Sequence, residues 1–507
     1  MITESMLLSV VWIIPVLLAV LTLPLNKEDH LTVKKINALG HGLNLLIAIY
    51  LTVQFLTTVD NSILKPTGTV TRLAFATDVM WIPALNIHYN IGVDGLSMLM
   101  LLLTSMIILA GTFASWKVTT QAKEFFILLN TLVAGVYGVF ISFDLFTFFL
   151  FYEVAVLPMY LLIGVWGTGP KEYSAMKLTL MLVGGSALIV AAMFGLYFES
   201  GLKTFDLNIL SQHRFSLEFQ YWAYPVLFIG FGVLSALFPF HTWSPDGHAS
   251  APTAVSMLHA GVLMKLGGYG ILRVAMYLLP EGAQHWMPFF LILITLNVAV
   301  GPLVAVAQKD LKYITAYSSV SHLGLVLLGL SVGTFTGLLG ASMQMISHGL
   351  LTGLFFALIG MIYGRTHTRI VTEMGGLMKV MPFLGVAFAI TGFAGLGLPG
   401  LSGFVAEATI FVGAFENANS LVRCCAVLSI MSIVATGVYV IRSANFMLHG
   451  TIPEELQHHG ELTDADSIEK TAIIILMIGL LGMGIYPTWI ANLLSGSMTP
   501  IFNNLMR

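Results

Sequence analysis

A lysine occupies the middle of a long apolar segment, at Lys265 in AVSMLHAGVLMKLGGYGILR. A cation at the centre of a membrane span costs about 2.5–3.5 kcal/mol on insertion scales, so it normally faces a partner or water rather than lipid. Gly261, Gly267, Gly268 and Gly270 surround it and let neighbouring helices approach closely. The alternative is a lysine that snorkels to a headgroup. Apolar or small residues for several turns on each side favour the buried interpretation.

Two carboxylates lie in comparable surroundings. Glu153 sits in LFTFFLFYEVAVLPMYLL, with Pro158 later in the same segment. Glu407 follows a run of glycines and prolines in LGLPGLSGFVAEATIF, a pattern that predicts a broken span. Ionisable groups inside a membrane are functional candidates, so Glu153, Lys265 and Glu407 could hold and pass protons. Each carboxylate could instead be a paired or hydroxyl-bonded interior group.

Three histidines add candidate relay stations. His322 in YSSVSHLGL and His348 in MQMISHGLL each lie in the middle of an apolar segment, and His259 precedes Lys265 by six residues. An imidazole has an unperturbed pKa of about 6.5 and can take up and release protons. A single histidine in a membrane could equally be a hydrogen bond between helices. The presence of several such histidines in the spans between Lys265 and Glu407 favours the relay.

The chain carries no sequence pattern for redox chemistry or nucleic-acid binding. Its two cysteines, Cys424 and Cys425, are adjacent and cannot form a spaced metal site. It has no nucleotide-binding fingerprint and no haem attachment motif, and its net charge of −3 includes no basic stripe. With 57% hydrophobic and 9% charged residues among 507, the sequence predicts a polytopic membrane protein without a metal or cofactor of its own. Met1–Leu25 predicts a first span rather than a cleavable signal peptide.

These residues must be positioned by membrane helices. The sequence predicts an all-α fold of about fourteen spans, of which the seventh is broken near Pro239 and the twelfth near Pro399 and Gly400. The breaks fall in corresponding places of two five-helix units, spans 4–8 and 9–13, which predicts inverted repeats. The predicted spans are 6–24, 37–56, 93–115, 124–142, 145–167, 174–199, 221–240, 252–279, 286–307, 313–333, 335–364, 380–413, 420–447 and 470–493. The predicted domains are 1–123 with three spans and a surface hairpin near 57–92, 124–279 and 280–448 for the two repeats, and 449–507 for an acidic loop and the last span.

The distribution of lysines and arginines among the loops predicts the orientation of the chain in the membrane. Most of them, such as Lys27 and Lys312, fall on loops of one side, whereas a few, such as Lys65 and Lys203, fall on the other. Positive-inside bias therefore predicts both termini outside and the turn at His241–His248 inside. An even number of spans agrees with two termini on one face.

Four stretches carry a resemblance to a known family: FYEVAVLPMYLLIGVWG, PFHTWSPDGHASAPTAVSMLHAGVLMKLGGYG, DLKYITAYSSVSHLG and GLPGLSGFVAE. Over essentially its whole length, the chain resembles the antiporter-like subunits of proton-pumping NADH:quinone oxidoreductase, respiratory complex I. The segment around Glu153 favours the M type among them. The resemblance implies a proton-translocating subunit without redox chemistry. Similar chains serve in multi-subunit sodium/proton antiporters and in membrane-bound hydrogenases, which are the alternatives.

The resemblance also implies a role for each matching position. Glu153 would belong to a first half-channel, Lys265 would be the central lysine, and Glu407 would end a second half-channel at the outer side. His322 and His348 would lie along the hydrated axis between Lys265 and Glu407. Flavin, iron–sulfur clusters and quinone are implied in or between other subunits, the related chains L and N are implied as partners, and a bacterial inner membrane is the implied location.

One position departs from the family pattern. The family pairs a lysine of the broken seventh span with the glutamate of span five, whereas alignment on Pro239 and His241 places Leu234 there. Lys177, in YSAMKLTLML, is the candidate compensating cation. Without compensation, Glu153 lacks its usual partner and the chain could be a scaffold subunit that does not pump.

Overall fold

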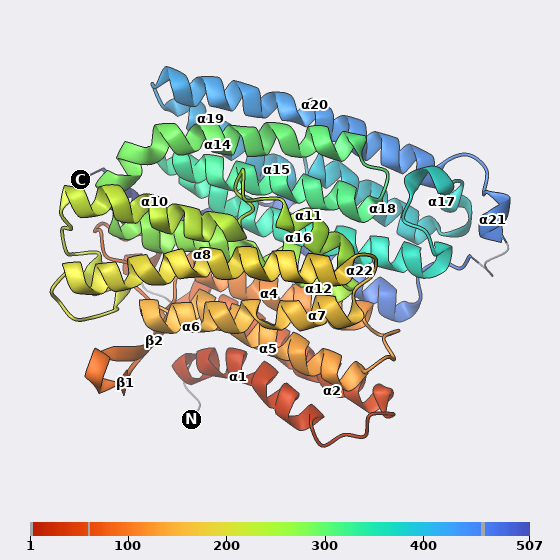
Figure 1. Ribbon diagram of the computed structural model, residues 1–507, viewed down its shortest axis with the longest axis horizontal. Coiled ribbons are helices and arrows are strands. Elements are labelled where there is room, and N and C mark those ends of the chain that lie inside the picture. The colour runs from red at the N-terminus through yellow and green to blue at the C-terminus, as the bar shows by residue number, and fades with distance from the viewer. Residues whose placement is uncertain (1–3, 59–60, 458–461, 507) are drawn as a thin grey trace.

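The computed structural model describes residues 4–58, 61–457 and 462–506 and is mostly helical. Long apolar helices lie side by side along one direction, and their connections gather at two ends (Figure 1). We call one end the hairpin end, because it carries strands β1 (Ala74–Ile82) and β2 (Ile87–Val93). The opposite end is the α17 end, after the short helix α17 (Leu377–Val380).

Fourteen segments of the described chain cross the bundle, in agreement with the predicted number of spans. Thirteen are long and apolar enough to span a membrane, and the twelfth crossing is shared by two shorter helices. In chain order the crossings are α1 (Glu4–Thr22), α2 (His30–Thr58), α4 (Gly95–Ala114), α5 (Ala122–Ile141), α6 and α7 (Leu145–Val156 and Pro158–Trp166), α8 (Lys171–Glu199), α10 (Leu217–Leu234), α12 to η3 (Thr253–Met276), α14 (Pro280–Ala307), α15 (Leu311–Ser331), α16 (Phe335–Thr366), α18 and α19 (Pro382–Gly395 and Ser402–Glu416), α20 (Ser420–Leu448) and α22 (Ser467–Ile485). Short helices occupy the connections: α3 (Asn61–Leu64), η1 (Pro83–Leu85), α9 (Leu207–Leu210), α11 (Trp243–Ser250), η4 (Val371–Glu373) and α21 (Glu454–Gln457).

The eighth crossing lies at the core of the bundle. The most apolar window of Thr253–Met276 is 100% buried, and the corresponding windows of α15 and α16 are 94% buried. In α1, α2 and α22 the buried share is 33%, so these helices turn most of their surface outward. Polar side chains inside a membrane protein face other helices rather than lipid. The buried crossings are therefore the ones that can hold the predicted ionisable residues.

Aspartates begin several crossings. The carboxylates of Asp94, Asp144 and Asp310 accept hydrogen bonds from backbone N–H groups in the first turns of α4, α6 and α15. These N–H groups have no partner within their own helix, so the caps stabilise the point at which each helix starts. Asp94 also pairs with the guanidinium of Arg273 from the eighth crossing, and both side chains are buried.

The hairpin end is covered by β1, β2 and a last helix, α23 (Thr488–Leu505). The strands pair antiparallel and form the predicted surface hairpin, whereas residues 59–60 of that predicted segment lie outside the described chain. The predicted last span differs: α22 ends at Ile485 rather than near 493, since the chain bends at Tyr486 and Pro487 and continues as α23. Asn504 Nδ2 donates to the Tyr277 carbonyl at 2.7 Å, which holds α23 against the end of the eighth crossing.

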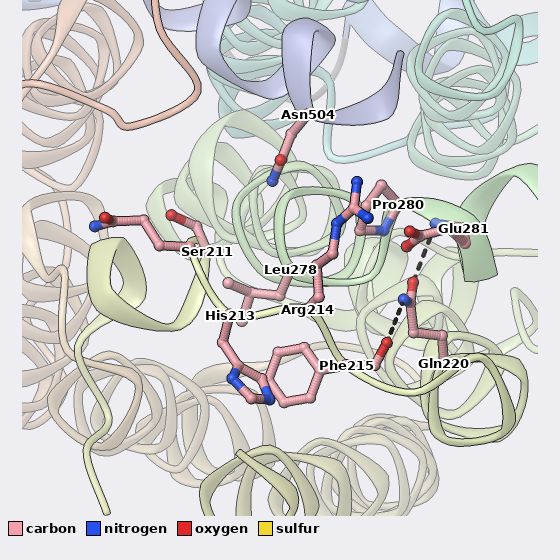
Figure 2. Close-up of a pocket in the computed structure, with 10 residues that line it drawn as sticks. Ser211, His213, Arg214, Phe215, Gln220, Leu278, Pro280, Glu281 and Asn504 are labelled. Carbon is pink, nitrogen blue, oxygen red and sulfur yellow. Dashed lines mark hydrogen bonds between the residues drawn. The ribbon is translucent and has the colours of Figure 1, made fainter. Parts of the chain in front are cut away.

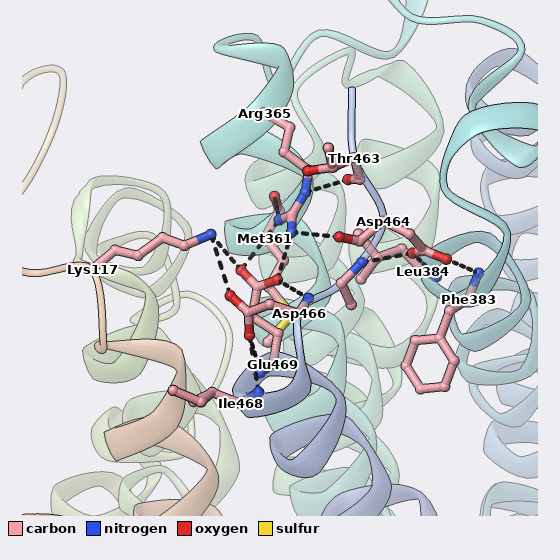
Figure 3. A network of polar contacts seen from close by, with 11 residues as sticks. Lys117, Met361, Arg365, Phe383, Leu384, Thr463, Asp464, Asp466, Ile468 and Glu469 are labelled. Carbon is pink, nitrogen blue, oxygen red and sulfur yellow. Dashed lines mark hydrogen bonds and ion pairs between the residues drawn. The ribbon is translucent and has the colours of Figure 1, made fainter. Parts of the chain in front are cut away.

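A network of charges ties the acidic loop before α22 to the α17 end (Figure 3). Glu469 accepts hydrogen bonds from Arg365 Nη2 at 2.6 Å and from Lys117 Nζ at 2.8 Å. The carboxylate of Asp464 accepts from the first two N–H groups of α18 after Pro382, at 2.8 and 3.2 Å. Residues 458–461 of the predicted loop lie outside the described chain. The described part has the connecting role that its sequence indicates.

Candidate functional site

Lys265 is completely buried at the first position of α13 (Lys265–Gly270). This short helix lies between two π-helical stretches, η2 (His259–Leu263) and η3 (Ile271–Met276). The wide turn before it is visible in the backbone, because the Met264 N–H bonds the carbonyl of His259, five residues back. The carbonyl of Ala260 accepts a hydrogen bond from the Lys265 ammonium. Such wide turns are frequent at functional sites.

A chain of neighbouring side chains leads from Lys265 to Glu407. Lys265 Nζ lies 2.8 Å from His348 Nδ1, and the imidazole rings of His348 and His322 are 5.4 Å apart. His322 Nδ1 in turn lies 3.2 Å from Glu407 Oε1. The four residues come from α13, α16, α15 and α19, and all are buried. The structure therefore brings together four of the residues that the sequence singles out.

The break in the twelfth crossing holds the carboxylate end of this chain. Gly397 has a φ of +74°, a conformation that L side chains rarely adopt, and a Cβ built there would lie 3.0 Å from Glu407 Oε2. Ser402 begins the second helix and its hydroxyl accepts from Ser347 Oγ at 2.8 Å. The loop containing Pro399 and Gly400 thus interrupts the twelfth crossing close to the carboxylate, as the glycine and proline run predicts.

On the other side of Lys265, His259 lies among aromatic rings rather than in a hydrogen-bonded chain. Its ring is 5.2 Å from Trp243 and 4.3 Å from His248. Within the described chain, neither of its ring nitrogens has a hydrogen-bond partner. His248 is also fully buried, and its Nε2 lies 3.2 Å from Met264 Sδ. The predicted relay residue His259 is therefore close to the lysine but is not bonded to it.

Glu153 lies in α6, one turn before the interruption at Leu157 and Pro158. The Ser186 hydroxyl interacts with its carboxylate, and Oε1 has no hydrogen-bond partner among the residues that the structure describes. No described cation is within ion-pair distance of this carboxylate either. Leu234, the last residue of α10, is fully buried. Glu153 is thus separate from the chain that joins Lys265 to Glu407.

The break in the seventh crossing is held by polar contacts. Asn297 of α14 donates to the Ala236 carbonyl at 2.9 Å and accepts from the Phe238 N–H next to Pro239, so it pairs backbone groups that the broken helix leaves free. Lys177, the candidate partner of Glu153, bonds Asp246 Oδ2 at 2.7 Å instead. Asp246 lies in α11, beyond the break.

The sequence does not single out two further buried polar residues, of which Gln344 contacts the chain of side chains and Lys312 does not. Gln344 Nε2 lies 3.3 Å from His322 Nδ1, so its amide contacts the same nitrogen as Glu407. Lys312, assigned to a loop by the charge pattern, is buried in the first turn of α15, and its ammonium donates to the Ala251 carbonyl at 2.5 Å. An amide in the middle of an apolar helix is the signal that could have identified Gln344.

Elsewhere in the described chain, a pocket is a further candidate for a functional site. A pocket at the hairpin end is lined by Ser211, His213, Arg214, Gln220, Glu281 and neighbours (Figure 2). It encloses about 20 Å³, enough for a water molecule. Among the residues that the structure describes, no group of three or more His, Cys, Asp or Glu could hold a metal ion.

Fourteen membrane crossings, two broken helices and a buried chain of lysine, histidine and glutamate define an antiporter-like membrane subunit. Residues 142–435 match the family model described as NADH:quinone oxidoreductase/Mrp antiporter, TM. The chain belongs to this family, as an antiporter-like subunit of the M type, or chain 4.

Known proteins are similar to this chain over most of its length. NAD(P)H-quinone oxidoreductase chain 4 of Gloeobacter violaceus is 35% identical over 483 residues, which cover 95% of this chain and 89% of that protein. The chain 4 of Acaryochloris marina is 37% identical over 424 residues, covering 83% and 79%. A chain in respiratory complex I from Thermus thermophilus with bound NADH superposes with a TM-score of 0.87 at 27% identity, covering 99% and 100%. A chain of the archaeal membrane-bound sulfane sulfur reductase has the same fold, with a TM-score of 0.84 at 22% identity over 99% and 98% of the two chains.

Proposed function

We propose that this chain translocates protons as a membrane-arm subunit of a complex I-type oxidoreductase. The observation that carries the proposal is the buried chain from Lys265 through His348 and His322 to Glu407, in which contacting groups can each bind a proton. Its members come from four different crossings, so the fold must be assembled before the chain exists. The relatives named above are chains of NAD(P)H-quinone oxidoreductases, which favours this function over a sodium/proton antiporter, a hydrogenase or a scaffold subunit.

The proposed path runs across the bundle. Protons are taken up on the inside near Glu153 and the break of the seventh crossing, load Lys265, and pass through His348 and His322 to Glu407 and the outside. The hairpin end, with both termini, then faces outward, and the membrane is a bacterial inner membrane. Moving one charge against 100 mV costs about 2.3 kcal/mol, and one pKa unit is worth about 1.4 kcal/mol. A change of a few units in the proton affinity around Lys265 is therefore large enough to drive the transfer.

Redox energy reaches this chain from other subunits. Its sequence has no nucleotide fingerprint, cysteine cluster or haem motif, so flavin, iron–sulfur clusters and quinone belong in or between other chains. This chain then acts by translocation alone. Its partners in the membrane arm are the related chains L and N.

The first test measures protons moved per electron pair in sealed vesicles carrying the intact complex. Lys265→Ala is compared with wild type and with Lys27→Ala, which removes a lysine whose side chain is 79% exposed. Equal assembly of all three must be shown by native gels. We expect a lower ratio in Lys265→Ala and a wild-type ratio in the control. An unchanged ratio in Lys265→Ala would contradict the proposed path and indicate a scaffold subunit.

The same vesicles distinguish a redox-driven proton pump from a sodium/proton antiporter. Sodium-dependent proton exchange without an electron donor would indicate an antiporter instead. Mass spectrometry of the copurifying subunits provides an independent check, because a redox-driven pump must copurify with electron-transfer chains.

A further inference from the structure

A second group of buried polar side chains lies between α2, α4 and α5, outside the residues that match the family model. We call it the Asn–His column. It consists of Asn37, His41 and Asn44 from α2, Asn130 and Tyr137 from α5, and Ser105 from α4, and each of them is 0% exposed. Positions 37, 41 and 44 share one face of α2, and 130 and 137 share one face of α5. Amides and imidazoles buried inside a membrane are costly unless they are hydrogen-bonded, so the column requires an explanation.

Hydrogen bonds at one end of the column have a fixed direction. Asn37 Nδ2 donates to the Val33 carbonyl at 2.8 Å, so Asn37 Oδ1 is free to accept, and it receives Asn130 Nδ2 at 2.7 Å. Asn130 Oδ1 is then an acceptor, and it lies 2.9 Å from His41 Nε2. Because an acceptor must face a donor, His41 Nε2 carries a hydrogen. The lone pair of the neutral imidazole is therefore on Nδ1.

The other end of the column is fixed in the same way. Asn44 Nδ2 donates to the Val11 carbonyl of α1 at 2.9 Å, which makes Asn44 Oδ1 an acceptor. Ser105 Oγ donates to the Leu101 carbonyl at 2.9 Å, so Tyr137 is the donor in its 2.8 Å bond to Ser105. Two buried atoms of the column have no partner among the described residues, His41 Nδ1 and Asn44 Oδ1. Both are acceptors, and both lie on the same face of α2.

We infer that His41 Nδ1 and Asn44 Oδ1 hold an internal water molecule, and that His41 Nδ1 is a proton-binding atom reached through it. A water molecule supplies two O–H donors, which is what two acceptors three residues apart on one face of α2 require. A proton that reaches this water is passed on to the Nδ1 lone pair, so the ring becomes an imidazolium and the water stays a neutral molecule. The new N–H of the ring donates to the water oxygen, while Nε2–H keeps its bond to Asn130. A column that served only for packing would leave both acceptors unsatisfied.

The charged surroundings of His41 are few. On α2, Lys34 shares its face toward the α17 end and is 6% exposed. On α5, Lys123 and Glu124 lie in the first turn, and Tyr137 is the remaining titratable group. The described part of α1 holds one titratable side chain, Glu4 at its far end, and α4 holds none. The column is thus a site of its own and does not depend on the Lys265 chain.

The water is tested by a cryo-EM map of the intact complex at a resolution that shows internal waters. We expect density within hydrogen-bond distance of both His41 Nδ1 and Asn44 Oδ1, and its loss in Asn44→Leu. A wild-type map that resolves other internal waters but shows none here would overturn the water site.

Proton binding is tested by infrared difference spectra of the intact complex between pH 3.5 and pH 8, with isotope-labelled histidine. His41→Gln is the matched variant, since its amide nitrogen keeps a donor for Asn130 but cannot take up a proton. We expect the loss of one imidazole signal among those of the 14 histidines. If the glutamine variant does not assemble, Asn44→Leu replaces it, and the same signal should shift or vanish. Spectra identical to wild type in the assembled variant would overturn proton binding at His41.

Discussion

Lys177 Nζ lies 2.7 Å from Asp246 Oδ2, and this ion pair joins the sixth crossing to the short helix beyond the break in the seventh. Tyr313 of the tenth crossing adds a hydrogen bond to Asp246 Oδ1 at 3.2 Å. The cation that the sequence offers to Glu153 is therefore bound to another carboxylate.

This ion pair predicts a measurable coupling. Lys177→Ala and Asp246→Asn should each destabilise the subunit, and the double variant should lose less than their sum. The side chains are 24% and 23% exposed, so the coupling should be about 1 kcal/mol. A double-mutant cycle on the free energy of unfolding in mixed micelles measures it. Lys171→Ala, on the same helix, should show no coupling to Asp246→Asn, and strictly additive effects at 177 and 246 would contradict the pair.

Leu234→Lys should introduce a cation at the position where the resemblance to the family implies a lysine. Leu234 is fully buried, so an unpaired ammonium there would cost about 2.5–3.5 kcal/mol, whereas pairing with Glu153 would offset much of that cost. We expect a higher ratio of protons to electrons, measured in sealed vesicles. The gain should disappear in a Glu153→Gln background. Equal effects of Leu234→Lys in both backgrounds would show that the two positions do not interact.

Gln344→Leu should slow proton transfer between His322 and Glu407. The Gln344 amide lies 3.3 Å from His322 Nδ1 and helps to orient the ring that faces the carboxylate. The proton ratio should fall while assembly is retained. Ser342→Ala provides the control, because its hydroxyl is buried on the same helix and bonds the Leu338 carbonyl. A fall of the same size in both variants would assign the effect to the helix rather than to His322.

Gly397→Ala should disturb the Glu407 end of the chain. Its φ of +74° would strain an alanine by about 1–2 kcal/mol, and the new Cβ would lie 3.0 Å from Glu407 Oε2. We expect a lower midpoint of thermal unfolding and a reduced proton ratio. Gly42→Ala is the matched control: its Cβ would meet nothing within 4 Å, and alanine in a helix should be neutral or stabilising by up to about 1 kcal/mol. A wild-type ratio in Gly397→Ala would argue against a role for the break in positioning Glu407.

Asp144, at the connection between α5 and α6, predicts that the stability of the fold depends on pH. Burial, with a smaller contribution from Asp206, raises its pKa from the ordinary 3.8 to about 6 despite three backbone hydrogen bonds to its carboxylate. Because the folded state holds the proton more tightly, the protonated carboxyl stabilises the fold below pH 3.8, and this stabilisation is lost as the pH rises through 6. It amounts to at most about 3 kcal/mol of the free energy of unfolding. Asp144→Asn should therefore gain thermal stability relative to wild type at pH 8 more than at pH 5. An equal difference at both pH values would contradict the raised pKa.

The sequence by itself determined the class of fold and singled out the two ends of the proposed proton path, Lys265 and Glu407. Apolar segments of about twenty residues can satisfy their backbone groups in lipid only as helices, so fourteen crossings follow from composition and length. Lys265 and Glu407 stand out because charged residues are rare in such segments. The glycine and proline run before Glu407 predicts the break for the same local reason, the loss of helical hydrogen bonding.

The tertiary structure decided which side chains meet. His348 is 83 residues from Lys265, and Asp246 is 69 residues from Lys177, so their contacts depend on the packing and register of helices that are far apart in the chain. Periodicity shows which face of a helix is polar but not which helix lies against it. The contact of Gln344 with His322, the separation of Glu153 from the Lys265 chain, and the Asn–His column all follow from that packing. A buried polar group takes its partner from whichever neighbour the fold places within hydrogen-bond distance.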